Sequence, residues 1–213
     1  MQQKFMANKE QLDSNLGCPG IHPEPPTDLK TRDLPIIQIE KPWFRIHQSR
    51  YSPLYYGDSG NYRFDAPAQE YGVMYIALDP HGCFIETFGS HTGIQVISYR
   101  ELSLRSISVL SCDRPLQLVD LSGAGLVHIG ADARLTAAEY KVAQRWALAL
   151  WHHPAQVDGI YYRARHDLSQ FCAAIFERVK PVFTIGNTQI CVNRSFQKTL
   201  ATILETYKFG LID

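Results

Sequence analysis

Three charged side chains stand inside runs of apolar or aromatic residues, where a charge must either reach water or find a partner. They are Arg45 in Trp-Phe-Arg-Ile, Arg63 in Tyr-Arg-Phe and Glu86 in Phe-Ile-Glu-Thr-Phe. An unpaired buried charge is costly, so each of these residues invites the question of what it meets. For any one of these residues alone, a structural ion pair between Glu86 and one of the arginines is at least as good an interpretation as a role in ligand binding or catalysis.

The common signatures of other chemistries are missing. We find no phosphate-binding glycine loop, no dinucleotide-binding glycine fingerprint and no paired-histidine metal helix. The segment 121–125 (LSGAG) is typical of an ordinary turn, and His152 and His153, as neighbours, point in different directions and indicate a solvated helix end. The five cysteines are scattered without metal-site spacing, which predicts free thiols and no metal.

Three helices are expected to position these residues. Asp79 and Pro80 form a cap and a first turn, and the helix that follows carries Glu86 on the flank of its apolar face. A capping-box pattern at 136–139 predicts a long helix with an apolar stripe of Tyr140, Ala143, Ala147, Leu150 and Trp151. Asn193 can cap a terminal helix over about 196–207.

Short apolar runs predict a sheet of about five or six strands. They lie at 72–78, 94–98, 116–120, 159–162 and 181–185, and the run 171–176 is either a strand or a buried helical turn. Strands and helices do not alternate regularly, so the pattern favours an α+β fold over a doubly wound parallel sheet.

The remaining features concern the N-terminal segment, the class of partner and the cellular compartment. Residues 1–40 are polar and proline-rich and are expected to form an arm that is wrapped or partly disordered. Basic and acidic residues both number 21, which argues against nucleic acid and anionic membranes as partners. The absence of a long apolar run and the unpaired cysteines predict a soluble, cytoplasmic protein.

Several ordered blocks of the chain resemble the core of RES-domain proteins. The resemblance extends over about residues 43–176, and we assign residues 41–213 to the domain; the blocks are 61–67 (NYRFDAP), 71–77 (YGVMYIA), 83–88 (CFIETF), 118–123 (LVDLSG) and 158–163 (DGIYYR).

The resemblance implies an ADP-ribosyltransferase-like core of two small β-sheets around a cleft, with flanking helices. It implies an enzyme that degrades NAD at the bond between nicotinamide and ribose, with inorganic phosphate or water as acceptor. No cofactor would be held permanently. Such proteins are typically toxins of toxin–antitoxin systems, so the expected partners are an antitoxin protein and a second copy in a homodimer or larger assembly.

By position, the resemblance assigns four residues of the NAD pocket. Arg45 and Arg63 match the two arginines, which would grip phosphate groups by paired hydrogen bonds. Tyr75 matches the tyrosine, and Glu86 the glutamate, which would stabilise positive charge on the ribose. The expected catalytic residues are Glu86, Arg63 and Tyr75, and Arg45, Arg63, Tyr75 and His166 are expected to bind NAD.

The chain departs from the family where relatives carry serine in a Tyr-x-Ser-Arg block. Here residues 162–166 read Tyr-Arg-Ala-Arg-His, so Ala164 stands in the serine position. Either a neighbour such as His166 or Ser169 supplies the missing hydrogen bonds, or activity is weakened or lost. Two alternatives therefore stay open: an ADP-ribosyltransferase acting on a protein, and a catalytically weakened binding module.

Overall fold

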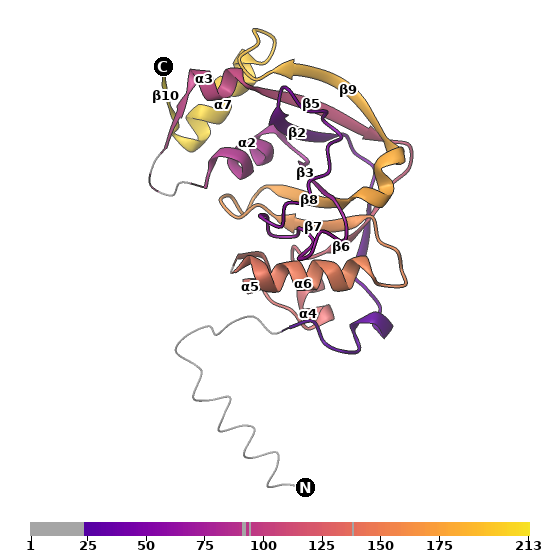
Figure 1. Cartoon of the computed structure of the whole chain (residues 1–213). Helices are drawn as coiled ribbons and strands as arrows, with labels where there is room; N and C mark the ends of the chain where they lie inside the picture. The colour runs from indigo at the N-terminus through magenta and orange to yellow at the C-terminus, as the bar shows by residue number, and fades with distance from the viewer. Residues whose placement is uncertain (1–23, 91–92, 94, 138) are drawn as a thin grey trace, which may run out of the picture.

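The computed structural model describes residues 24–90, 93, 95–137 and 139–213 (Figure 1). The strands are β1 (Ile36–Ile39), β2 (Trp43–Gln48), β3 (Val73–Ala77), β4 (Val96–Ser98), β5 (Arg105–Cys112), β6 (Leu116–Asp120), β7 (Gly159–Arg163), β8 (Phe171–Phe176), β9 (Phe183–Ile190) and β10 (Gly210–Ile212). The helices are α2 (Pro80–Phe88), α3 (Tyr99–Ser103), α4 (Ala124–Ile129), α5 (Arg134–Ala137), α6 (Tyr140–Trp151) and α7 (Gln197–Tyr207), with 3-10 turns η1 (Leu29–Thr31) and η2 (Glu177–Val182).

Among the described residues, the strands form a main sheet of eight in the order β1-β6-β7-β8-β3-β2-β5-β9 and a separate parallel pair, β10 with β4. In the main sheet β6 and β7 run parallel, and the other neighbours are antiparallel. The chain is α+β, as the sequence predicts. In place of two separate small sheets, one long sheet curls so that its two halves face each other (Figure 1).

A weak seam divides the main sheet between β2 and β3. These two strands, both fully described, share one register pair, Phe44 with Ala77, whereas β2 pairs with β5 from Trp43 to Gln48. On its other side β3 pairs with β8 over its full length. Beyond the shared pair β2 and β3 splay apart, so a wedge-shaped space opens between residues 45–48 and residues 73–76.

The two faces of β3 enter different parts of the core, as the two-residue repeat of a strand requires. Met74 and Ile76 join a buried cluster inside the curled sheet. Val73 and Ala77 join the cluster beneath α6, and Tyr75 packs against it. Figure 1 shows α6 alongside β6, β7 and β8, with α2 and α7 at the other half of the sheet, next to β2 and β5. Tyr75 therefore lies on the same face of β3 as Val73 and Ala77, the face that packs towards α6.

Helix α2 begins as the sequence predicts. The Asp79 carboxylate accepts a hydrogen bond from the main-chain N–H of His81 at 2.7 Å, and Pro80 occupies the first turn. The helix buries residues 82–85 and carries Glu86 in its last turn. This local order sets the position of the acidic side chain.

The starts of the two longer helices differ from the sequence prediction. Helix α6 begins at Tyr140 after Glu139, whose side chain makes no capping hydrogen bond, and Thr136 lies instead in the short α5. Helix α7 begins at Gln197 after Phe196, and Asn193 closes a preceding turn by accepting a hydrogen bond from Ser195 N. Propensity alone placed these caps one turn too early.

Several strands were not predicted. Residues 36–39, which we placed in the polar arm, pair with β6 at the edge of the main sheet. Strands β2 and β5 were also missed, so the expected total of five or six was too low. The ambiguous run 171–176 is the strand β8, and the segment 121–125, expected to be an ordinary turn, includes the start of α4 at Ala124. Residues 1–23 of the expected arm lie outside the described residues.

Within the described part of the chain, the helices are all too short or too polar to cross a membrane.

Candidate active site

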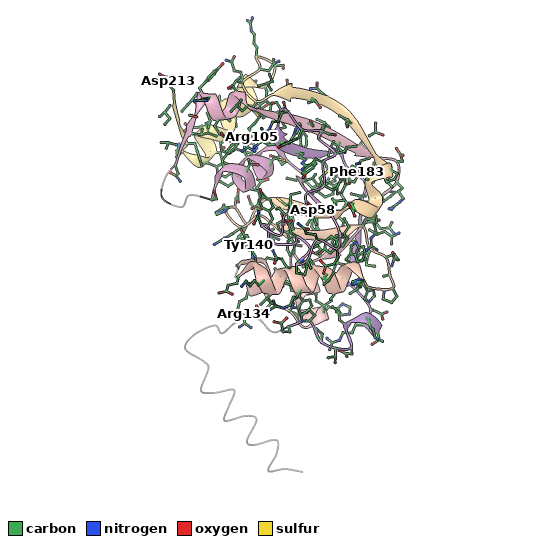
Figure 2. The ribbon with its side chains drawn as sticks, in the orientation of Figure 1. Asp58, Arg105, Arg134, Tyr140, Phe183 and Asp213 are labelled. Atoms are coloured by element: carbon green, nitrogen blue, oxygen red, sulfur yellow. The ribbon has the colours of Figure 1, made fainter. Side chains whose placement is uncertain are left out.

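A cavity with a volume of about 520 Å³, within the usual range for small-molecule sites, lies where β2 and β3 splay apart. Both halves of the main sheet contribute to its wall. Figure 2 shows Arg105 of β5 with the upper half and Tyr140 of α6 with the lower half, and both residues line the cavity. All five residues assigned from sequence also line it: Arg45, Arg63, Tyr75, Glu86 and His166.

Arg45 extends from β2 and holds the loop that follows this strand. Its Nη1 donates hydrogen bonds to the carbonyl oxygens of Pro53 at 2.5 Å and Tyr55 at 2.7 Å. Burial lowers the pKa of Arg45 to about 10, so the guanidinium stays positively charged at neutral pH. The residue therefore supplies charge to the cavity and also fixes the loop over residues 53–55.

Arg63 is 7% exposed and comes from the loop that precedes β3. Its guanidinium carbon lies 4.7 Å from the centre of the Tyr140 ring, a cation–π contact. Burial lowers the pKa of Arg63, and the negative potential of Glu86 is among the effects that oppose this shift. The first turn of α6 thus holds this arginine at the cavity.

Gln144, one turn farther along α6, anchors the same loop. Its buried Nε2 donates hydrogen bonds to the carbonyl oxygens of Gly60 at 2.8 Å and Tyr62 at 2.9 Å. The two acceptors flank the residues that lead into Arg63. Sequence reasoning did not single out Gln144, because its acceptors lie more than eighty positions away.

Tyr75 contributes its ring to the cavity wall, while its hydroxyl organises the Arg63 loop. The hydroxyl accepts a hydrogen bond from Phe64 N at 2.9 Å and donates one to Asp65 Oδ1 at 3.0 Å. Asp65 is buried, and its Oδ2 accepts hydrogen bonds from Tyr62 N and Ser59. Tyr75 therefore ties the loop to the sheet, a contact that the sequence does not reveal.

Glu86 faces the cavity from the last turn of α2. Its Oε1 accepts a hydrogen bond from the main-chain N–H of Arg165 at 2.8 Å. Burial raises the pKa of Glu86, and this hydrogen bond, the positive charge of Arg63, the Tyr162 hydroxyl and the charge of Arg165 act in the opposite direction. Glu86 thus interacts with these groups at the cavity. Among the described contacts, it takes part in no separate ion pair with a purely structural role.

Ala164 lies at the end of β7, fully buried in the core, and is absent from the described cavity wall. The next residue, Arg165, supplies the main-chain hydrogen bond to Glu86. His166 borders the cavity, and burial together with the charges of Arg165 and Arg63 lowers its pKa, so it is neutral at neutral pH. Ser169 bonds instead to Asp167.

The charge on the cavity wall is mainly positive. Four arginines line it against two carboxylates, and the lining residues that sequence reasoning did not assign include Asp65, Arg105, Tyr140, Tyr162 and Arg165. Tyr140 was placed on the apolar stripe of a helix, yet it is 39% exposed and faces Arg63. An anionic ligand with planar groups suits this combination of guanidinium and aromatic side chains.

Among the described residues, no group of three or more His, Cys, Asp or Glu side chains could hold a metal ion. The four described cysteines are free thiols, and Cys18 lies outside the described residues. His153 is buried and not solvated as expected. It accepts a hydrogen bond from Ala155 N, and its Nε2 lies 3.2 Å from the carbonyl oxygen of Arg32.

Comparisons with known proteins agree with this architecture. The family model for the RES domain matches residues 42–192. A protein named "Probable toxin y4kH" from Sinorhizobium fredii is 27% identical over 121 residues, which cover 56% of this chain and 90% of that protein. The fold is similar to that of a chain in the crystal structure of the M. tuberculosis MbcT–MbcA toxin–antitoxin complex, with a TM-score of 0.62, 14% identity, and coverage of 78% of this chain and 92% of that chain.

Proposed function

Because the chain belongs to the RES domain family, we propose that it is an enzyme that cleaves the bond between nicotinamide and ribose in NAD. The observation that carries the proposal is the meeting of Arg45, Arg63 and Glu86 around one cavity, although they come from three separate segments of the chain. The two guanidinium groups can bind the phosphates of the dinucleotide, and the carboxylate can stabilise the positive charge that develops on the reacting ribose.

The arginines suit the phosphate groups of NAD. Arg63 is fixed by Tyr140 on α6, and Arg45 by two carbonyl oxygens of the loop after β2, so neither side chain needs to be ordered when substrate binds. Charge-assisted hydrogen bonds from preorganised guanidinium groups give both affinity and orientation. The same groups can hold inorganic phosphate as the second substrate.

The carboxylate suits the ribose. When the glycosidic C–N bond breaks, its electron pair moves to the pyridinium nitrogen, so nicotinamide leaves as a neutral molecule and the ribose becomes an oxocarbenium-like cation. Ionised Glu86 stabilises this charge and orients the acceptor. An oxygen of phosphate or water then bonds to the anomeric carbon, and a proton is released when water is the acceptor.

The departure at Ala164 does not leave the carboxylate without a donor, since Arg165 N–H bonds to Glu86. This contact supports an active enzyme over a weakened binding module. We further propose that the protein is the toxin of a toxin–antitoxin pair and is restrained by an antitoxin. A protein named a probable toxin and a fold seen in a toxin–antitoxin complex support this part of the proposal.

The test is to incubate the purified chain with NAD, with and without inorganic phosphate, and to follow nicotinamide together with the ribose-bearing product. We expect nicotinamide release by the wild type and a loss of roughly a hundredfold or more in kcat for Glu86→Gln. Phosphate-dependent formation of a phosphorylated ADP-ribose selects phosphorolysis, and free ADP-ribose selects hydrolysis.

Other outcomes identify the alternatives. Adenylate label that becomes attached to protein would indicate an ADP-ribosyltransferase. Binding of NAD without nicotinamide release, at any protein concentration tested, would indicate a binding module. Undiminished turnover in Glu86→Gln would refute the role of the carboxylate.

A further inference from the structure

Exposed tyrosines gather at the cavity. In the described part of the chain, five tyrosines have large exposed fractions, and four of them line this one cavity; the five are Tyr51 (47%), Tyr55 (51%), Tyr62 (59%), Tyr99 (51%) and Tyr140 (39%). Leaving large rings exposed is unfavourable unless a ligand or partner covers them. The contacts of Tyr62 with Tyr75 and of Tyr140 with Arg63 tie two of these rings to the Glu86 side of the cavity.

The other two rings, Tyr51 and Tyr55, form a stacked pair at the loop after β2. Their ring centres are 5.6 Å apart and their planes differ by 20°. The guanidinium carbon of Arg50 lies 4.8 Å from the centre of the Tyr51 ring. Both rings therefore belong to an ordered aromatic surface in which each side chain stays about half exposed.

The backbone beneath this pair is held firmly. Tyr51 N donates to Gln48 O at 2.9 Å, Tyr55 N donates to Ser52 O at 3.1 Å, and Arg45 bonds to the carbonyl oxygen of Tyr55. A preorganised aromatic surface is the feature that binds planar bases at low entropic cost. The pair is thus joined directly to an arginine that we assign to phosphate binding.

We propose that the Tyr51–Tyr55 pair binds the adenine base of NAD by stacking. The inference rests on the proposed function and adds to it the place of the half of the substrate that is not cleaved. The order along the cavity is then nicotinamide ribose at Glu86, phosphates at the arginines, and adenine at the loop after β2.

Adenine suits this place better than nicotinamide. The ring that leaves must lie beside the carboxylate, and Glu86 accepts a hydrogen bond from Arg165 N, just after β7, near the positive charge of Arg63 from the loop before β3. The Arg45 side chain instead bonds to the carbonyl oxygens of Pro53 and Tyr55 in the loop after β2. The two sets of contacts therefore come from different segments of the chain.

The experiment compares Tyr51→Ser, Tyr55→Ser and the double variant with wild type on two substrates. NAD carries adenine, whereas nicotinamide mononucleotide carries the same scissile bond without it. We expect KM for NAD to rise roughly ten- to a hundredfold in the double variant, with kcat changed less than about threefold, because base stacking on an aromatic side chain contributes that much. Kinetic constants for nicotinamide mononucleotide should stay within about twofold of wild type.

The matched control is Tyr99→Ser, which removes an equally exposed tyrosine outside the described cavity wall and should leave both substrates unaffected. Binding of AMP by calorimetry gives a readout that is independent of turnover and should weaken by a similar factor. An unchanged affinity for AMP in the double variant, or an equal rise of KM for both substrates, would overturn the proposal. A wild type that binds AMP through these tyrosines but releases no nicotinamide would refute the proposed reaction and leave the stacking site standing.

Discussion

Replacing Gln144 with leucine tests how the loop that carries Arg63 is held. The side chain lies on α6, is 7% exposed, and donates to two carbonyl oxygens, Gly60 O and Tyr62 O. Leucine keeps the volume and the helix propensity but cannot donate. The two acceptors then lose their partner in a partly buried setting, and the loop is released from α6.

The structure allows the magnitude to be worked out. A buried carbonyl without its donor costs about 1 to 3 kcal/mol, and water reaches part of this loop, so two acceptors together should cost about 2 to 4 kcal/mol in Gln144→Leu. Displacement of Arg63 by about 1 Å is sufficient to lower kcat/KM for NAD by roughly a hundredfold. Urea unfolding measures the first quantity, and nicotinamide release measures the second.

The control is Gln197→Leu, since Gln197 is also a helical glutamine but is exposed on α7. This variant should change the free energy of unfolding by no more than about 0.5 kcal/mol. If Gln144→Leu matched the control in both stability and kcat/KM, the idea that α6 positions Arg63 through this side chain would be wrong.

Three further predictions concern single substitutions. Burial raises the pKa of Glu86, so the folded chain binds this proton more tightly than the unfolded chain and loses stability as the pH rises above the ordinary pKa of 4.5. In urea unfolding, Glu86→Gln should therefore be more stable relative to wild type at pH 8 than at pH 4. An equal difference between the two proteins at both pH values would contradict this. Asp158 is buried and bonds to Arg114 at 2.6 and 2.8 Å, so Asp158→Asn should cost about 2 to 3 kcal/mol in thermal unfolding, whereas Asp28→Asn at the surface should cause no measurable loss; equal losses in the two variants would refute the contribution of the Asp158–Arg114 pair. Ala164→Ser should change kcat less than about threefold, because Arg165 N already bonds to Glu86 and Ala164 is fully buried and outside the described cavity wall; a tenfold gain in nicotinamide release would show instead that the hydroxyl is needed.

The sequence was most informative where local chemistry decides the structure. Asp79 and Pro80 predicted the start of α2 and hence the place of Glu86 on its flank. The charged residues inside apolar runs, Arg45, Arg63 and Glu86, line the same cavity in the structure. The first result depends on capping geometry. The cost of isolated buried charges singled out the three charged residues, and the resemblance to RES-domain proteins implied that they share a pocket.

Long-range hydrogen bonds explain what the sequence could not reveal. Strand β5 was missed because its serines interrupt the apolar pattern, yet Ser108 is buried between His47 Nε2 at 2.9 Å and Thr188 at 2.8 Å. Likewise, Ile36–Ile39 in the expected arm is a strand only because β6 offers a free edge. Partners that are tens of positions apart leave no periodic signal in the chain.

The seam at Phe44 and Ala77 has a mechanical consequence. A sheet bends most easily where the fewest register pairs connect neighbouring strands. The main sheet is therefore expected to be most flexible between β2 and β3. Arg45 lies on β2 and Tyr75 on β3, and both line the cavity. A small rotation of one strand relative to the other would therefore change the width of the cavity between them. The single pair between Phe44 and Ala77 thus helps to set the width of the cavity.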